Sequence, residues 1–212
     1  CSSDLVDLYG IGTNLTCFSF IQADEEKMER LAEMRKKVEN AADHTLEIVS
    51  GGNSAALDLM MRGGICEGVD NFRLGESLLF GKERSRYTFL PGTRNDGFIL
   101  ECEVVEAKVK PSLPWGTAGV DSYGRKPVFT NRGEKRKKVI CAIGRQDFDA
   151  ETATPVDEGI LILGASSDHL MLDVTDSVKE YKVGDIVELR LGYFSVLRAF
   201  TSPYVEKIFL KK

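Results

Sequence analysis

The chain has 212 residues, enough for one large domain or two small ones. It is 42% hydrophobic and 29% charged with a formal net charge of −5, which is typical of a globular protein and argues against a general nucleic-acid surface. Five scattered cysteines without a C-x-x-C pair, and two histidines, favour free thiols over disulfides or zinc. Free thiols fit a reducing cytoplasm, where we expect the protein. No membrane-length apolar run and no signal peptide is visible.

The first 90 residues alternate between strand and helix patterns. An apolar, β-prone run covers 5–20, Asp24 follows as a helix N-cap, and apolar residues then recur at helical spacing. The segment 45–50 (TLEIVS) predicts a short buried strand that the glycines at 51–52 interrupt before a helix. The segment 71–81 (NFRLGESLLFG) predicts a third strand that runs into a turn. This order predicts a parallel α/β arrangement, and three such strands cannot close a barrel by themselves.

Residues 91–97 (PGTRNDG) form a predicted linker, and the helical period disappears after it. Strand-like runs follow at 98–110, 138–144, 159–166, 169–174, 185–192 and 205–211. Residues 178–192 are typical of a barrel hairpin with its turn at Gly184 and Asp185. We therefore predict a partial α/β barrel at 1–92 and an all-β domain at 97–212.

A basic cluster at 132–138 (RGEKRKK) precedes one of these strand-like runs. Charge runs of this kind usually form a solvated strand flank. We favour that interpretation over a nucleic-acid-binding patch, because the chain as a whole is acidic.

Two features at strand ends could bind an anion. Gly51 and Gly52 lead into a helix at Ser54, and a helix N-terminus with a nearby hydroxyl binds phosphate readily. The alternative is an ordinary N-capped turn. Arg73 follows the next strand, where an ion pair is the structural alternative. If these are the last two strands of a barrel, Ser54 and Arg73 lie at the same mouth.

Six segments together resemble the conserved blocks of the alanine racemase family, and are closer still to its alanine/ornithine-type members. They are GIGTNLTCF (10–18), SGGNSAAL (50–57), FRLGESLLFG (72–81), ICAIGRQDFD (140–149), LGASSDHLMLDVTD (163–176) and SPYVEKIF (202–209). The resemblance implies a pyridoxal 5'-phosphate (PLP) enzyme with an eight-stranded α/β barrel, a C-terminal β domain and a head-to-tail homodimer. By this match the chain holds barrel strands six to eight and the β domain, and we expect the cofactor-bearing lysine upstream of Cys1.

The resemblance also implies roles toward the cofactor ring. Asn14 falls where a side chain meets the ring, a position that is usually histidine in alanine racemase itself. Arg73 matches the arginine that faces the pyridine nitrogen. A guanidinium has no acceptor and keeps its protons, so the ring nitrogen stays unprotonated and the ring is a weaker electron sink.

A second group of residues matches the phosphate ligands of the family. Asn53 and Ser54 correspond to an asparagine–serine pair, with Ser54 on the phosphate. Gly75 and Glu76 correspond to backbone ligands of the phosphate. Tyr204 lies within one position of a tyrosine that reaches the same group.

The second acid or base is not apparent. Arg145 stands where alanine racemase carries its tyrosine base, and Asp147 and Tyr123 are the candidate replacements. Asp168 matches a loop that the partner subunit lends to the active site. His169 is either a further neighbour of that site or an ordinary hydrogen-bonded residue at a strand end.

The hypothesis from these features is PLP-dependent racemisation of a free amino acid of the ornithine or alanine type. Without the lysine, we expect this chain alone neither to hold PLP covalently nor to racemise at useful rates. One alternative is a non-enzymatic PLP-binding protein, although such proteins usually lack a C-terminal β domain. The other is a β-domain interaction module, which would have no phosphate affinity at Ser54.

Overall fold

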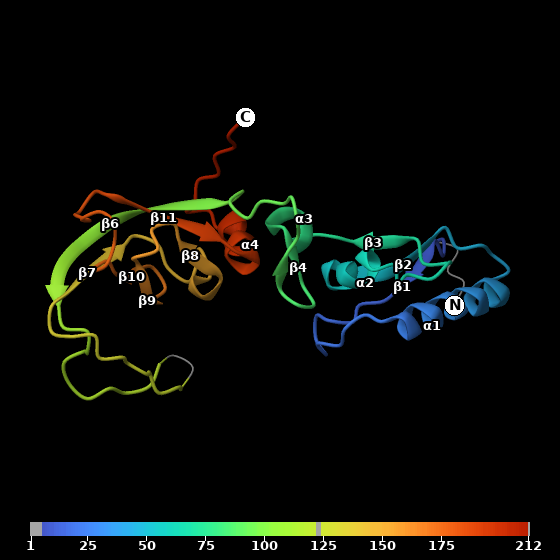
Figure 1. Cartoon of the computed structure of the whole chain (residues 1–212), viewed down its shortest axis with the longest axis horizontal. Coiled ribbons are helices and arrows are strands. Elements are labelled where there is room, and N and C mark those ends of the chain that lie inside the picture. The colour runs from blue at the N-terminus through green and yellow to red at the C-terminus, as the bar shows by residue number, and fades with distance from the viewer. Residues whose placement is uncertain (1–5, 122–123, 212) are drawn as a thin grey trace. The chain divides into compact units, whose positions relative to one another are not determined.

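A computed structural model describes residues 6–121 and 124–211. The chain divides into two compact units, Cys1–Gly97 and Phe98–Lys212, which we describe separately (Figure 1). Tyr123, a candidate second base, lies outside the described residues.

The first unit contains a three-stranded parallel sheet in the order β1-β2-β3. Its strands are β1 (Gly10–Gly12), β2 (Ile48–Asn53) and β3 (Asn71–Arg73), and a short hairpin pairs β4 (Lys82–Glu83) with β5 (Thr88–Phe89). Its helices are α1 (Glu25–Ala42), the 3-10 turn η1 (Ser54–Ala56), α2 (Leu57–Met61) and α3 (Glu76–Phe80).

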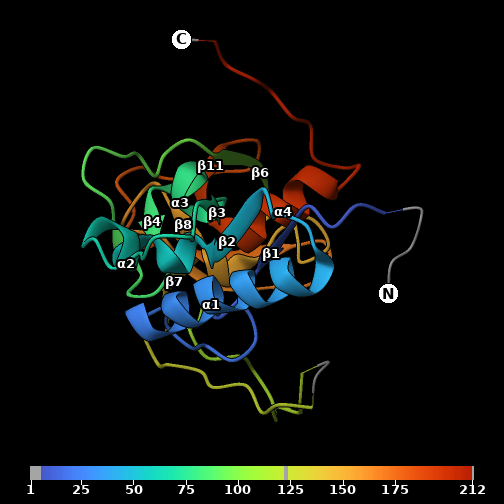
Figure 2. The ribbon, with the colours of Figure 1, turned by 90° about the vertical axis from the view of Figure 1, so that its right-hand side faces the viewer.

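Helices α1 and α2 cover one face of this sheet (Figure 2). Asp24 caps α1, because its carboxylate accepts a hydrogen bond of 3.0 Å from the Lys27 amide. Met28 of α1 is fully buried and packs in one cluster with Val49 of β2 and Leu59 of α2. Since side chains alternate along a strand, the neighbours of Val49 in β2 project from the opposite face.

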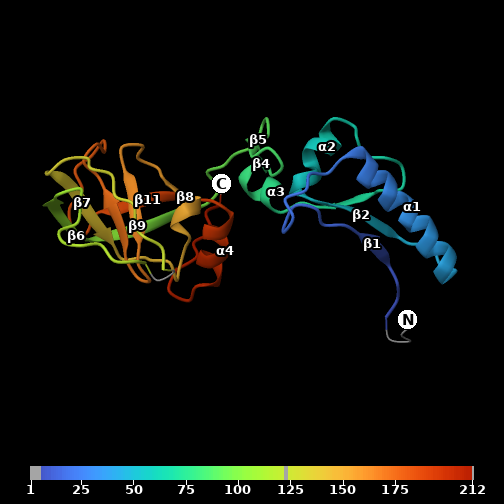
Figure 3. The same cartoon turned by 90° about the horizontal axis from the view of Figure 1, so that it is seen from below.

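The second unit is a six-stranded antiparallel sheet that curves into a near-barrel (Figure 3). In the order β8-β11-β6-β7-β10-β9, its strands are Ala153–Pro155, Ile186–Leu191, Ile99–Lys110, Arg136–Cys141, Leu170–Asp173 and Leu161–Ala165. The turn η2 (Ala150–Thr152) and the helix α4 (Tyr193–Thr201) complete it. Leu100, Cys102 and Val104 alternate with exposed residues along β6 and join a core around the fully buried Phe148.

The fold class is therefore confirmed: a small parallel α/β sheet precedes an antiparallel near-barrel. Three expectations for the first unit were wrong in detail. Within the described part of 5–20 only Gly10–Gly12 is strand, because hydroxyls such as Ser19 bond the local backbone and turn the chain. The glycines at 51–52 do not end β2, which continues with a register shift to Asn53. Residues 76–80 form helix α3.

The second unit is the expected β-barrel-like domain, with the helix α4 that packs its Ala199 into the core. Two expectations for this unit were wrong. Residues 178–183 form no strand, because β11 pairs with β6 and β8; the turn at 182–185 does form. No strand forms in the described part of 205–211, where Phe209 and Leu210 are exposed. An apolar alternation gives a strand only where a neighbouring strand can pair with it.

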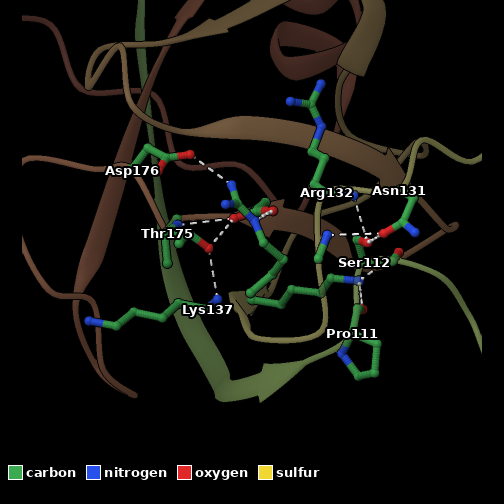
Figure 4. A network of polar contacts seen from close by, with 12 residues as sticks. Pro111, Ser112, Asn131, Arg132, Lys137, Thr175 and Asp176 are labelled. Carbon is green, nitrogen blue, oxygen red and sulfur yellow. Dashed lines mark hydrogen bonds and ion pairs between the residues drawn. The ribbon is translucent and has the colours of Figure 1, made fainter.

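The basic cluster is more than a solvated flank, because Arg136 is largely buried. Thr175 and Asp176, labelled in Figure 4, belong to the polar network of this cluster. The Arg136 guanidinium donates to Asp173, which is 1% exposed, at 2.8 Å, and to the exposed Asp176 at 2.7 Å. The Asp173 carboxylate also accepts the Thr175 amide and hydroxyl. This network ties the start of β7 to the end of β10.

Candidate functional site

The candidate residues of the first unit gather at the carboxyl edge of the parallel sheet. Parallel strands end at the same edge, so the loops after β1, β2 and β3 meet there. Asn14 follows β1, Asn53 ends β2, and Arg73 ends β3. The structure therefore brings together three side chains that lie up to 59 positions apart in the sequence (from Asn14 to Arg73).

The Arg73 side chain extends along the carboxyl edge of the sheet from β3 to the loop after β1. Its Nη1 donates to the Ser50 hydroxyl of β2, and its Nη2 donates to the Thr13 carbonyl beyond β1 at 2.8 Å. A guanidinium carries five N–H donors, and these two bonds do not exhaust them. The side chain is thus held over the strand ends as an exposed cation, and no carboxylate among the described residues forms an ion pair with it.

The side-chain amide of Asn53 contacts η1 through its oxygen and the loop after β1 through its nitrogen. Its Oδ1 accepts the Ala55 amide at 2.9 Å and so caps η1. Its Nδ2 donates to Asn14 Oδ1 at 3.3 Å and to the Cys17 sulfur at 3.4 Å. Asn14 and Asn53, predicted to serve one cofactor, are therefore in direct contact.

Ser54 and Ser77 form a buried pair of hydroxyls. They are 5% and 4% exposed, and their oxygens lie 3.2 Å apart. The Ser77 amide also donates to Ser54 Oγ at 3.2 Å. This contact joins the end of β2 to helix α3.

Gly75 and Glu76 stand at the start of α3, next in the chain to Ser77. A side chain built on Gly75 would meet no protein atom within 4 Å, so its backbone borders open space. The Glu76 carboxylate pairs with Arg84 at 3.3 Å. Only the backbone of Glu76 is therefore a candidate ligand of an anion.

In the second unit, the structure brings the segments of Arg145 and Asp168 side by side. The Arg145 amide donates to the Ser166 carbonyl at 2.8 Å, and its Nε donates to the Ala165 carbonyl at 2.8 Å. A Cβ on Gly144 would lie 2.3 Å from the Asp168 amide nitrogen, so only glycine permits this approach. Asp168 itself is exposed and accepts the Ser167 hydroxyl at 2.9 Å.

The remaining candidates in this unit have different surroundings. Asp147 is buried and accepts the Ser202 hydroxyl at 2.6 Å, so its carboxylate is committed to a structural contact. Tyr204 is 78% exposed. His169 is exposed at the end of the turn that leads into β10, and its amide donates to the Ser166 hydroxyl at 3.0 Å.

The sequence reasoning missed Thr13, Ser50 and Ser77 as parts of the site. Thr13 and Ser50 hold Arg73, and Ser77 holds Ser54. The available signal was their position, since Thr13 follows β1, Ser50 lies in β2, and Ser77 lies in the helix that follows β3. Their partners could not be assigned without the strand register.

Gly12 leaves the space that Arg73 needs to cross the sheet. A Cβ on Gly12 would lie 3.0 Å from Ser50 Cβ and 3.4 Å from Arg73 Nη1. We expect Gly12→Ala to displace the guanidinium and to destabilise the first unit by about 1 to 3 kcal/mol through overpacking. Hydrogen exchange of the β1 and β2 amides measures this loss of stability.

Gly97→Ala is the control, because a Cβ at Gly97 would meet nothing within 4 Å, and it should change the exchange rates little. An unchanged exchange rate in Gly12→Ala would contradict the prediction.

Two absences hold for the described residues. None of their helices has the length and apolarity of a membrane-spanning segment. In residues 6–121 and 124–211, no three side chains of His, Cys, Asp or Glu gather where they could hold a metal ion.

This fold matches part of the alanine racemase fold. An alanine racemase from Clostridium difficile 630 in complex with cycloserine superposes with a TM-score of 0.52 at 20% identity, over 92% of this chain and 51% of that one. An alanine racemase from Bartonella henselae with covalently bound pyridoxal phosphate gives a TM-score of 0.51 at 20% identity, over 84% and 46%. No protein-family model matches the chain.

Sequence similarity is stronger. The chain is 45% identical to an ornithine racemase of Acetoanaerobium sticklandii over 95% of its own length, and 43% identical to a lysine racemase of Thermotoga maritima over 96%. In both comparisons it spans 57% of the relative's length. The chain is a homologue of the alanine racemase family, of partial length relative to these proteins.

Proposed function

We propose that the chain is part of a PLP-dependent racemase that acts on a basic amino acid of the ornithine or lysine type. The observation that carries the proposal is the convergence of Asn14, Asn53, Ser54 and Arg73 on one sheet edge. The identity to ornithine and lysine racemases supports the substrate class.

The donors at this edge fit PLP. A phosphate accepts hydrogen bonds, and Ser54 supplies a donor for it, together with the backbone of Gly75, which borders open space, and the next amide, of Glu76. Arg73 supplies a cation that cannot lose its proton, and so suits an unprotonated pyridine nitrogen. Asn14 and Asn53 would orient the ring between these two ends.

When bound, PLP supplies an electron sink that makes the α-proton of an attached amino acid removable. The residues of this chain would bind the phosphate, orient the ring and keep its nitrogen unprotonated. Arg73 is suited to the last task because Ser50 and Thr13 hold its guanidinium in place.

Racemisation needs a proton donor or acceptor on each face of the α-carbon. In this proposal a lysine outside these 212 residues serves one face. The other face of the α-carbon is served by the partner subunit of a homodimer, whose second unit presents the segments of Arg145 and Asp168. Asp147 is the weaker candidate for a base because Ser202 occupies its carboxylate.

The test is a PLP titration of both the full-length gene product and the 212-residue chain, followed by visible absorbance and by chiral analysis of ornithine, lysine and alanine. We expect the full-length protein to show a lasting PLP band and to racemise a basic amino acid. We expect the 212-residue chain to show neither.

The other outcomes separate the alternatives. A PLP band without racemisation by the full-length protein would indicate a non-enzymatic PLP-binding protein. If the full-length protein has no affinity for PLP, Ser54 and Arg73 have structural roles only, as in a β-domain interaction module. Racemisation of alanine alone would overturn the basic-substrate class.

A further inference from the structure

Ser77 completes the hydrogen bonds of the Ser54 hydroxyl. The two side chains lie on different elements, η1 and α3, 23 positions apart, and both are more than nine-tenths buried. Ser77 approaches Ser54 Oγ twice, with its amide at 3.2 Å and with its own hydroxyl at 3.2 Å. Two contacts from one residue to one oxygen restrict which way that hydroxyl can point.

The number of lone pairs on the Ser54 oxygen limits which further hydrogen bonds its hydroxyl can form. A hydroxyl oxygen has two lone pairs and one proton. The Ser77 amide takes one lone pair. If the Ser77 hydroxyl donates into the second, the only group left on Ser54 is its proton, which must be donated outward. If Ser54 instead donated to Ser77, it would have no proton for an anion.

We infer that Ser77 is a positioning residue that makes Ser54 a donor-only hydroxyl for the phosphate of PLP. The inference rests on the proposed function, and it adds a residue that acts through Ser54. Phosphate oxygens at neutral pH are chiefly acceptors, so a hydroxyl fixed as a donor binds them without first reorienting. Burial strengthens the effect, because few water molecules compete for the Ser54 proton.

The test compares pyridoxine 5'-phosphate with pyridoxine by calorimetry on the 212-residue chain. Neither probe carries an aldehyde, so lysines do not react with them, and their difference isolates the phosphate. We expect Ser77→Ala to weaken the binding of pyridoxine 5'-phosphate about fivefold and to leave the binding of pyridoxine unchanged. The substitution keeps the amide bond and suits a helix, so α3 should persist.

Two further variants distinguish positioning from a general structural role. Ser77→Thr keeps the hydroxyl and should restore most of the affinity. Ser77→Ala in a Ser54→Ala background should cause no additional loss, because its effect passes through Ser54.

Each other outcome is decisive. Unchanged phosphate affinity in Ser77→Ala, equal losses for both probes, or an additive loss in the double variant would overturn the role of Ser77 alone. If the unsubstituted chain binds both probes equally or neither, the proposed phosphate site fails, and the inference fails with it.

Discussion

Replacing Arg136 by methionine should lower the free energy of unfolding of the second unit by about 3 kcal/mol. Methionine keeps much of the aliphatic stem but removes the guanidinium from a carboxylate that is 1% exposed. Among the residues that the structure describes, Thr175 would then be the remaining hydrogen-bond donor to the buried Asp173 carboxylate. Hydrogen exchange of the β7 and β10 amides measures the loss locally, since β10 pairs with β7.

Asp176→Asn is the matched control, because Asp176 pairs with the same guanidinium at 2.7 Å but is 66% exposed. An exposed pair contributes less than about 1 kcal/mol and is screened by salt. Equal losses from Arg136→Met and Asp176→Asn would show that burial of the Asp173 pair is not the cause.

The Arg136–Asp173 pair also predicts how the stability of the second unit depends on pH. Burial alone would raise the pKa of Asp173, but the hydrogen bonds from Arg136 and Thr175 outweigh it and hold the pKa below its ordinary value of 3.8. A carboxyl with a lowered folded pKa stabilises the fold above that ordinary value, and the contribution is lost as the pH falls through the folded pKa. The difference between the wild type and Arg136→Met should therefore be largest near neutral pH and shrink toward and below pH 3.8. A difference that grows on acidification would contradict this account.

Replacing Ser54 by alanine should weaken binding of pyridoxine 5'-phosphate by roughly 10- to 100-fold. The lost hydrogen bond is to a charged phosphate, and such bonds contribute about 1.5 to 3 kcal/mol. The effect should exceed that of Ser77→Ala, because Ser54 is proposed to touch the phosphate directly and Ser77 to act through it. Calorimetry on the 212-residue chain measures both.

Pyridoxine is the control ligand for this variant, since it lacks the phosphate. Its affinity should be the same for the wild type and Ser54→Ala. A parallel loss of both ligands would indicate that alanine disturbs the η1 turn, and would remove Ser54 from the phosphate site. The Asn53 cap of η1 is independent of the Ser54 hydroxyl, so we expect the turn to persist.

Local patterns predicted a large part of the fold. The N-cap at Asp24 and the helical spacing after it specify α1, because both signals lie within the helix itself. Apolar residues alternate with charged ones in the first half of β6, and this local pattern matches its alternation of buried and exposed residues. Helix α4 was missed because its apolar run follows a strand directly. Its Ser195 is anchored by bonds to Thr152 of η2 and to the Asp149 carbonyl, 43 and 46 positions earlier in the chain.

The sequence by itself determined the alternation of strands and helices around the first sheet and placed Asn53, Ser54 and Arg73 near strand ends, because capping, spacing and alternation act over a few residues. Only the tertiary structure decided their partners. Arg73 reaches Thr13 across 60 positions, and Ser54 meets Ser77 across 23. These contacts depend on strand order, register and rotamer, which are set by packing between distant segments.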